Sequence, residues 1–274
     1  RRAVYLTHVS LTSLSYRIKV SDVFMKKNWK KITAELPTAT MLLCTGCWKK
    51  EKTEEAAKVT LNEVAHSIFY APQYAAIELG YFKEEGIDLT LVTGFGADKV
   101  MTALISGDAD IGFMGSEASV YIYTGGSSDY AVNFAQLTQR AGNFLVSRDN
   151  ISNFKWSDVK GKTIIGGRAG GMPQMLLEYI LKKNNIDCKK DVEIVQNIDF
   201  GSTAAAFASG LGDFTVEFEP SATAIESENK GYIAASLGVD SGYVPYTAYC
   251  AKKSFLKNNP EIIQSFTNAI QKGL

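Results

Sequence analysis

The chain has 274 residues, of which 46% are hydrophobic and 21% charged, and its 29 lysines and arginines balance 29 aspartates and glutamates. Since a domain averages about 150 residues, this length predicts two compact units with ordinary buried cores. The balanced charge creates no strong field toward phosphate backbones or anionic lipid, which argues against nucleic acid as a partner. No stretch of the sequence reaches the roughly 18 apolar residues that a transmembrane helix needs.

The first part of the chain has the order of a secretory signal. After Met25 come four lysines, then the weakly apolar stretch Ile32–Leu43, and small residues lead to Cys47. This order resembles a bacterial lipoprotein signal, in which a cysteine after a small residue is lipidated and becomes the new N-terminus. Cys44 and Cys47 also have CxxC spacing, but a charged stretch follows them instead of a core helix, which favours export over redox chemistry. We therefore predict Cys47 as a lipid anchor.

Two further segments are expected to lie outside the folded body. Residues 1–24 precede a start methionine and show no clean periodicity. Residues Trp48–Lys58 are charged and have no large apolar face, as in a flexible tether between a membrane and a domain. Residues 1–57 are thus predicted to be upstream sequence, lipoprotein signal and tether.

The body begins with alternating strands and helices. Strands are predicted over Val59–Ala65, Ile87–Val92 and Ile111–Met114, and helices over Pro72–Leu79 and Asp98–Ile105. This alternation predicts a parallel sheet covered by helices, in which ligands collect at the carboxyl ends of the strands.

One segment of the body recurs later in the chain. Ala103–Ile111 corresponds to Ala206–Phe214, and in both copies a helix ends at Ser-Gly, an aspartate turn follows and an apolar strand begins. Because Ser-Gly is also a common helix stop, two unrelated helix ends are the alternative. A duplicated sheet would place the two strand tips opposite each other across a cleft. These tips are Gly115, Ser116 and Glu117 in the first copy and Phe218, Glu219 and Pro220 in the second.

A glycine-rich loop lies between the two copies. Thr163–Gly167 is predicted to be a strand, and Arg168–Pro173 leads from it into the helix Gln174–Lys183. Backbone N–H groups at Gly170, Gly171 and Met172 can approach a ligand at this helix start. The loop has neither a GxGxxG nor a phosphate-loop pattern, which disfavours a nucleotide, and a tight strand-to-helix turn is the alternative.

Five motifs carry a resemblance to a known family. They are His66–Ala76 (HSIFYAPQYAA), Gly80–Ile87 (GYFKEEGI), Ala103–Gly112 (ALISGDADIG), Lys160–Ile164 (KGKTI) and the aromatic-Glu-Pro sequence Phe218–Pro220. In order and spacing they resemble the ABC transporter substrate-binding proteins of the thiamine-pyrimidine, sulfonate and nitrate-uptake group. The resemblance covers about residues 58–274.

The resemblance implies an α/β, two-lobed type II periplasmic-binding-protein fold, in which each lobe is a mixed sheet flanked by helices and the ligand cleft lies between the lobes. Residues 58–150 plus 238–274 would form lobe 1, and residues 151–237 lobe 2. The extended stretches Arg140–Ser147 and Gly242–Ala251 are the expected crossings between them. The helix predicted from Pro260 has no stop signal before Leu274, so we expect family members to continue further.

Several of these residues have side chains suited to a ligand. Phe69 and Tyr70 follow the first strand and can stack on a flat or cationic ring, and Glu117 and Glu219 can pair with amino groups. Core packing, hinge packing and solvated loop acids are the alternatives for these side chains. The complete expected ligand-binding set is Phe69, Tyr70, Gly115, Ser116, Glu117, Thr138, Gln139, Gly170, Gly171, Met172, Phe218, Glu219 and Tyr246.

The function that the resemblance implies is that of an extracytoplasmic receptor, not an enzyme. It would close around thiamine or an aminopyrimidine precursor and deliver this ligand to an ABC permease and its ATPase. It would act as a monomer at the outer face of the cell membrane or in the periplasm, and its lipid anchor would be its only contact with the membrane. Taurine, alkanesulfonates or nitrate are alternative ligands. An enzyme of the same fold that makes the pyrimidine precursor is the second alternative, but its cysteine-rich iron motif is missing. No metal, cofactor or catalytic residue is expected, because His66 has no neighbouring ligand and no serine has the context of a triad.

Overall fold

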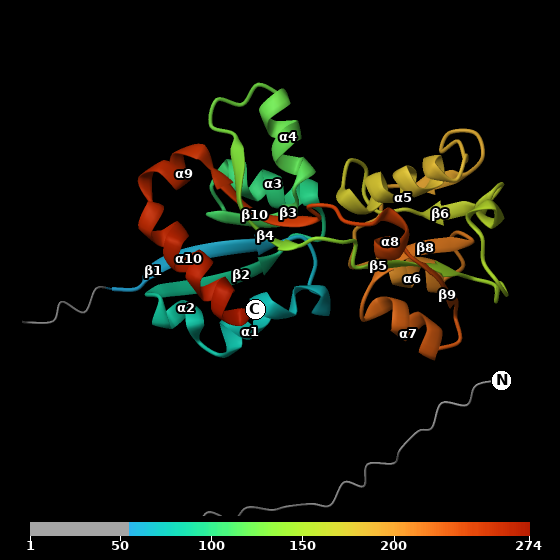
Figure 1. The fold of residues 1–274 in the computed structure, drawn as a ribbon, viewed down its shortest axis with the longest axis horizontal. Coiled ribbons are helices and arrows are strands. Elements are labelled where there is room, and N and C mark those ends of the chain that lie inside the picture. The colour runs from blue at the N-terminus through green and yellow to red at the C-terminus, as the bar shows by residue number, and fades with distance from the viewer. Residues whose placement is uncertain (1–54) are drawn as a thin grey trace, which may run out of the picture. The chain divides into compact units, whose positions relative to one another are not determined.

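The computed structural model describes residues 55–274. The predicted signal and the lipid anchor at Cys47 therefore lie outside the described residues. The described part contains two five-stranded sheets, each covered by helices on both faces (Figure 1). These sheets confirm the predicted α/β fold with two mixed sheets.

The first sheet combines parallel and antiparallel strands. Its strand order is β2-β1-β3-β10-β4, in which β1 pairs in parallel with β2 and β3, and β10 runs antiparallel to β3 and β4. Every residue of β3, the central strand, is buried. The strands are β1 (Ala57–Glu63), β2 (Ile87–Thr93), β3 (Ile111–Gly115), β4 (Ala131–Thr138) and β10 (Thr247–Lys252).

Helices cover both faces of this sheet. Because β2 and β3 flank β1 on opposite sides, right-handed crossovers place the helices after β1 and after β2 on opposite faces. Accordingly α10 packs on α1 and α2, whereas α3 contacts β3 and α4 (Figure 1). The aromatic rings of Phe113 and Tyr249 stack at 4.3 Å between centroids in the core. The helices are η1 (Ile68–Tyr70), α1 (Ala71–Glu78), α2 (Tyr81–Glu84), α3 (Ala97–Ser106), α4 (Glu117–Thr124), α9 (Lys253–Asn258) and α10 (Pro260–Gly273).

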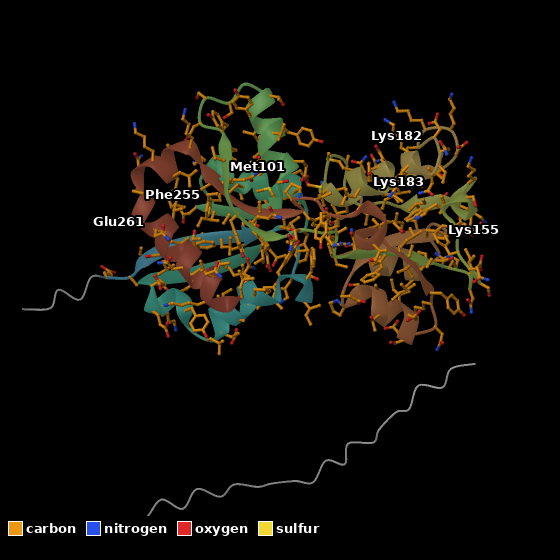
Figure 2. All side chains as sticks on the ribbon, in the orientation of Figure 1. Met101, Lys155, Lys182, Lys183, Phe255 and Glu261 are labelled. Atoms are coloured by element: carbon orange, nitrogen blue, oxygen red, sulfur yellow. The ribbon has the colours of Figure 1, made fainter. Side chains whose placement is uncertain are left out.

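The second sheet has the same plan. Its order is β7-β6-β8-β5-β9, with β6 parallel to β7 and β8, and β5 antiparallel to β8 and β9. The longest helix of this lobe, α5, buries Leu177, Ile180 and Leu181, while Lys182 and Lys183 in its last turn lie far from the first sheet (Figure 2). The elements are β5 (Asn143–Ser147), η2 (Trp156–Val159), β6 (Thr163–Ile165), α5 (Met172–Lys183), β7 (Glu193–Val195), α6 (Thr203–Ala208), β8 (Phe214–Phe218), α7 (Ser221–Ser227), β9 (Tyr232–Ser236) and α8 (Leu237–Ser241).

The chain passes between the sheets at the two stretches predicted as crossings, but the predicted lobe bounds differ from the strand pairing. β4 ends at Thr138 in the first sheet and β5 begins at Asn143 in the second, although residues up to 150 were assigned to lobe 1. The return follows α8, which packs on α5 and β5, so residues 238–241 also belong with the second lobe. The physical reason is strand pairing: β5 joins β8 and β9, which lie far ahead in the sequence.

The repeated segment has the same hydrogen bonds in both lobes. The backbone N–H of Thr60 donates to Asp110 Oδ2 at 2.9 Å, and that of Thr163 donates to Asp213 Oδ2, also at 2.9 Å. The backbone N–H of each aspartate donates in return to the carbonyl of the same threonine. In each lobe the aspartate turn thus ties the strand that it starts to the neighbouring parallel strand. This shared geometry supports the duplication.

Removing either aspartate carboxylate should destabilise its lobe. For Asp110→Ala and Asp213→Ala we expect a loss of about 1–2 kcal/mol in the free energy of unfolding in urea, because each change leaves a strand N–H without its charged acceptor. Asp108→Ala is the matched control, since Asp108 lies in the same turn and, among residues 55–274, its carboxylate accepts only from Ser106. Equal losses for Asp108→Ala and Asp110→Ala would contradict this role.

Candidate functional site

The ends of several strands meet where the two lobes face each other. Gly115 ends β3, Phe218 ends β8, Tyr246 immediately precedes β10, and Met172 starts α5. The space enclosed among them is only about 10 Å³, so the two lobes are in contact here. We call this space the cleft pocket. It is lined by Val64, Tyr70, Ala97, Gly115, Glu117, Gly171, Met172, Pro173, Phe200, Phe218, Tyr246 and Thr247.

Glu117 is the charged residue of the cleft pocket. It is 7% exposed, and neither of its carboxylate oxygens has a hydrogen-bond partner among the described residues. Burial raises its pKa to about 7, although the nearby backbone N–H groups of Glu117 and Met172 lower it in part. Both of these groups belong to helix starts, where the helix dipole favours an anion. The side chain has room to fold back because position 115 is a glycine: a Cβ there would lie 2.1 Å from Glu117 Oε2.

Aromatic rings form much of the remaining wall. Phe69 lies 6.1 Å from Phe218 in a stacked arrangement and 5.6 Å from Tyr246 edge-on, and Phe200 meets Phe218 at 5.8 Å. The Phe69 ring packs against Gly142 in the first crossing, where a Cβ would lie 2.3 Å from the ring. Phe69 therefore contacts residues of both lobes and of the crossing.

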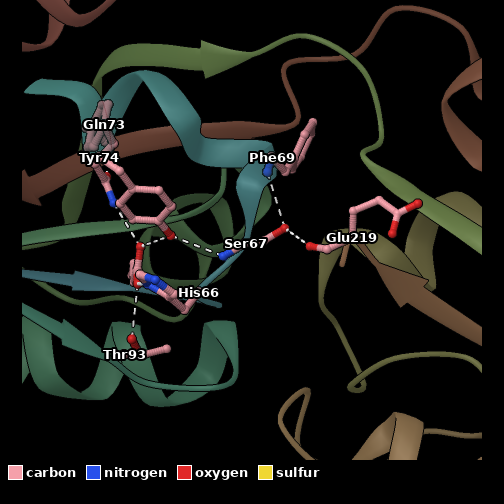
Figure 3. Close-up of polar contacts among 9 residues, drawn as sticks. His66, Ser67, Phe69, Gln73, Tyr74, Thr93 and Glu219 are labelled. Carbon is pink, nitrogen blue, oxygen red and sulfur yellow. Dashed lines mark hydrogen bonds and ion pairs between the residues drawn. The ribbon is translucent and has the colours of Figure 1, made fainter. Parts of the chain in front are cut away.

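A second buried carboxylate supports the loop that carries Phe69. Glu63, at the end of β1, accepts hydrogen bonds from Gln73 Nε2 and Tyr74 Oη at 2.8 Å each and from Thr93 Oγ1 at 3.1 Å, and its other contact is His66 Nδ1 at 2.8 Å. Figure 3 shows these side chains around one point. All of these partners belong to the first lobe, so Glu63 is a structural acid that fixes the loop after β1.

The same loop reaches the second lobe through Ser67. Tyr74 Oη accepts from the backbone N–H of Ser67, and Ser67 Oγ donates to the carbonyl of Glu219 (Figure 3). The side chain of Glu219 points away from this contact and accepts from the N–H and the hydroxyl of Thr223, at the start of α7. The Glu219 carboxylate, which was expected to face the cleft opposite Glu117, is therefore turned elsewhere: Glu219 contributes its backbone carbonyl at this contact, and its side chain caps a helix.

The other predicted residues divide between cleft and hinge. Phe69 packs beside the cleft pocket, and Tyr70, Gly115, Glu117, Gly171, Met172, Phe218 and Tyr246 line it. Thr138 Oγ1 instead bonds Thr247 Oγ1 at 2.8 Å, the carbonyl of Gln139 accepts from the N–H of Val244, and Ser116 Oγ donates to the carbonyl of Pro245. The first two contacts join the outgoing and returning crossings, and the third ties the end of β3 to the returning crossing. This indicates a hinge role for Thr138, Gln139 and Ser116.

A larger cavity of about 580 Å³ lies beside the cleft pocket. Helices α3 and α4 of the first lobe and the glycine loop of the second form its walls, and Met101 of α3 is one of its buried side chains (Figure 2). We call it the α3–α4 cavity. Gly170, a predicted ligand-binding residue, lies here and not in the cleft pocket. The cavity is lined by Ala97, Asp98, Met101, Thr102, Ile105, Ser106, Ala118, Tyr121, Ile122, Arg168, Ala169, Gly170 and Gly171.

Charged side chains join the lobes at the rim of this cavity. Arg168 of the second lobe donates from Nε to Asp98 Oδ1 of the first lobe at 2.8 Å, and its Nη1 lies 2.6 Å from Asp199 Oδ1. Lys99 of the first lobe contacts Asp199 at 2.7 Å. The Arg168 guanidinium lowers the pKa of Asp98. Gly96 makes this possible, since a Cβ there would lie 2.7 Å from Arg168 Cδ.

Sequence patterns missed these inter-lobe residues for a clear reason. Asp98 and Lys99 begin a predicted helix, where an acid is common, and Asp199 and Phe200 lie in a loop without a motif. Only Arg168 stands next to a feature that the sequence analysis singled out, the glycine loop. The pairing of these residues depends on how the two lobes meet, which no local pattern records.

Residues 55–274 contain neither a cluster of metal ligands nor a membrane-spanning helix. In this range no group of three or more histidine, cysteine, aspartate or glutamate side chains is arranged to hold a metal ion. Within the same range no helix combines the length and hydrophobicity needed to cross a membrane.

Protonation of Glu117 should make stability depend on pH. A raised pKa means that the folded protein keeps a proton that the unfolded chain loses between about pH 4.5 and 7, so the free energy of unfolding falls as pH rises through this window. In Glu117→Gln this contribution is absent. We expect the stability of the wild type relative to Glu117→Gln to decrease between pH 5 and pH 8 in urea unfolding. Glu217, whose pKa is also raised to about 7, contributes equally to both proteins and cancels. A constant difference across this range would contradict the assignment.

Loss of Arg168 should favour separation of the lobes. Exposed ion pairs contribute about 0–1 kcal/mol each, so we expect Arg168→Gln to shift the closed-to-open ratio by about 3- to 10-fold and to raise the radius of gyration measured by X-ray scattering. High salt should have the same effect on the wild type. Lys190→Gln is the control, because Lys190 pairs with Asp187 inside the second lobe. An unchanged radius in Arg168→Gln would show that these pairs do not hold the lobes together.

Comparison with known proteins identifies the family. The "Putative binding protein YtlA" of Bacillus subtilis (strain 168) is 49% identical over 232 residues, which cover 85% of this chain and 69% of that protein. The alkanesulfonate-binding protein SsuA of Xanthomonas axonopodis pv. citri, solved with bound MOPS, has the same fold, with a TM-score of 0.68 at 16% identity over 80% of this chain and 73% of that one. The periplasmic nitrate-binding protein NrtA of Synechocystis PCC 6803 matches with a TM-score of 0.67 at 17% identity over 80% and 61% of the two chains. The family model described as "NMT1/THI5 like" matches residues 68–274, and the chain therefore belongs to the NMT1/THI5-like family of binding proteins with the type II periplasmic-binding fold.

Proposed function

We propose that this protein is the solute receptor of an ABC importer and that it closes around an amine-bearing heteroaromatic molecule, an aminopyrimidine of the thiamine-precursor type or thiamine itself. The proposal includes a location outside the cytoplasm, the lipid anchor predicted at Cys47, and delivery of the solute to a permease and its ATPase. In this role the protein binds and releases its ligand without changing any covalent bond.

One observation carries the ligand class: the carboxylate of Glu117 is buried among aromatic rings with both oxygens unpaired. Leaving a buried acceptor unsatisfied costs about 1–3 kcal/mol, and more for a charged group. A ligand that donates hydrogen bonds to this carboxylate would remove that cost. The site therefore favours a molecule with two adjacent N–H donors, since one carboxylate accepts two parallel hydrogen bonds.

An aminopyrimidine fits the remaining features of the site. Its exocyclic amino group and the neighbouring ring nitrogen, when protonated, form such a donor pair. Its flat ring suits the walls made by Tyr70, Phe200 and Phe218, because offset and edge-on contacts between rings are favourable by about 0.5–1.5 kcal/mol. Since the space between these walls is about 10 Å³ in this structure, they would have to move apart to admit the ring. A pKa near 7 for Glu117 allows a proton to be shared between carboxyl and ring.

Sulfonates and nitrate fit the site less well. The relatives with solved structures named above include receptors for alkanesulfonate and nitrate, but at 16–17% identity they share only the fold. An anion needs cationic side chains or N–H donors, and the residues that line the cleft pocket include no lysine, arginine or histidine. Glu117 would repel an anion in the same space.

Closure of the lobes supplies the binding mechanism. Glu117 and Tyr70 belong to the first lobe, whereas Met172, Phe200 and Phe218 belong to the second. A ligand touches both groups only when the lobes approach, so its binding energy favours the closed form. The contacts of Thr138 with Thr247 and of Gln139 with Val244 join the two crossings about which the lobes would rotate.

A ligand panel tests this function. Thiamine, 4-amino-5-hydroxymethyl-2-methylpyrimidine, taurine, alkanesulfonates and nitrate would be compared by melting temperature and calorimetry. We expect only the aminopyrimidines to stabilise the protein, by about 2.7 kcal/mol at 100 times the dissociation constant.

Variants test the role of the carboxylate. Glu117→Gln should weaken aminopyrimidine binding about 10- to 100-fold, because one of two charge-assisted hydrogen bonds is lost. Glu217→Gln is the control, since Glu217 is an equally buried acid that bonds Thr203 and Thr215 outside the cleft pocket. Stabilisation by the anions alone would overturn the ligand class, and turnover of an aminopyrimidine would overturn the receptor role in favour of an enzyme.

A further inference from the structure

The cleft pocket and the α3–α4 cavity are neighbouring parts of one inter-lobe space. Ala97 at the start of α3 and Gly171 before α5 line both. The cleft pocket encloses about 10 Å³ and the α3–α4 cavity about 580 Å³, so most of the free space lies on the side of the cavity. A volume of this size is within the range of about 300–1,000 Å³ that is common for small-molecule sites.

The walls of the α3–α4 cavity are mainly apolar. Met101, Ala118 and Ile122 form its inner part, and Ile105 and Tyr121 remain 37% and 50% exposed. Apolar side chains at such exposure gain free energy when a ligand covers them, by about 25 cal/mol for each Å² removed from water. These walls therefore suit an apolar or aromatic group.

The polar groups of the α3–α4 cavity already have partners within the protein and do not favour a charged ligand. Asp98 and Arg168 already neutralise each other at its rim. The remaining polar side-chain groups are the hydroxyls of Thr102, Ser106 and Tyr121, which already donate to the carbonyl of Asp98, to Asp108 and to Met175 Sδ respectively. The chemistry of the cavity thus differs from that of the cleft pocket, where a buried carboxylate lacks partners.

Both lobes contribute to the α3–α4 cavity. The ring of Tyr121 lies 3.7 Å from the position that a Cβ would take at Gly170, and its hydroxyl contacts Met175 Sδ at 3.4 Å. Gly170 has a φ of 76°, a conformation that favours glycine, so the loop turns close to α4 without a side chain. A group held here touches α3 and α4 on one side and the glycine loop on the other.

We propose that the natural ligand has two parts: an amine-bearing ring that pairs with Glu117, and an apolar or aromatic arm that occupies the α3–α4 cavity. This inference rests on the proposed function, and it narrows the substrate class from aminopyrimidines in general to those that carry a sizeable apolar or aromatic substituent. The arm contacts both lobes, so it adds to the free energy of closure as well as to affinity.

Two probes test the arm directly in the wild-type protein. One is 4-amino-5-hydroxymethyl-2-methylpyrimidine, and the other is its O-benzyl ether, which adds an uncharged ring to the same head. We expect the ether to bind about 10- to 100-fold more tightly by calorimetry, because burial of a phenyl-sized group contributes about 1.5–3 kcal/mol. Equal affinity for the two probes would overturn the inference and leave the proposed function intact. If neither probe bound, the proposed function would fail, and this inference with it.

Substitutions in the cavity locate the arm. Thr102→Trp places an indole in the α3–α4 cavity from an exposed position on α3, and Ile105→Trp does so from the next turn. Each should remove the advantage of the ether and leave the affinity for the short probe within about threefold. Gln264→Trp, at an exposed position on α10, is the control and should change neither affinity. An ether advantage that persists in both cavity variants would show that the arm binds elsewhere, and would overturn the assignment of the cavity.

Discussion

A carboxylate that leaves water must regain hydrogen bonds or a cationic partner, and Glu117 has neither a hydrogen-bond partner nor a cationic side chain in the cleft pocket among the described residues. The fold nevertheless holds this side chain at the junction of the lobes. Gly115 gives it space, the starts of α4 and α5 direct positive dipole ends toward it, and a raised pKa allows it to stay protonated near neutral pH. The proposed ligand, with its N–H donors, would supply the missing hydrogen bonds. The rest of the site can be understood from this one unsatisfied group.

The other buried acids show what a satisfied carboxylate looks like in the same molecule. Glu63 accepts from three donors and contacts His66, and Glu217 accepts from two threonine hydroxyls. Both are structural, because every partner is internal to one lobe. Glu63 and Glu217 therefore support the fold, whereas Glu117 is available for a ligand. The three residues are all glutamates, and they differ in their hydrogen bonds.

The sequence predicted the local design well and the inter-lobe contacts poorly. The repeat around Asp110 and Asp213, the glycine loop and the alternation of strands and helices are local patterns, and the structure contains them. Glu219 looked equivalent to Glu117 because both follow an apolar strand, yet its side chain caps α7. The position of a residue at the end of a strand therefore does not determine the direction in which its side chain points. The lobe boundary near β5 and the pairing of Arg168 with Asp98 depend on segments far apart in sequence, so no local period could reveal them.

The balance between closed and open lobes follows from these same groups. Contacts that favour closure are modest: the exposed ion pairs of Arg168 and Lys99, the bond from Ser67 to the carbonyl of Glu219, and the packing of Phe69 on Phe218. Burial of Glu117 opposes them, because closure removes its carboxylate from water without a partner. When the contributions for and against closure are nearly equal, a ligand needs only a small difference in its binding energy between the closed and open forms to change which form dominates. A difference of about 1.4 kcal/mol alters the closed-to-open ratio tenfold. A ligand that pairs with Glu117 would remove the cost of burying its carboxylate, which is the contribution that opposes closure. An arm in the α3–α4 cavity would add contact with both lobes. In the proposed receptor, recognition of the ligand and closure of the lobes would therefore be one event.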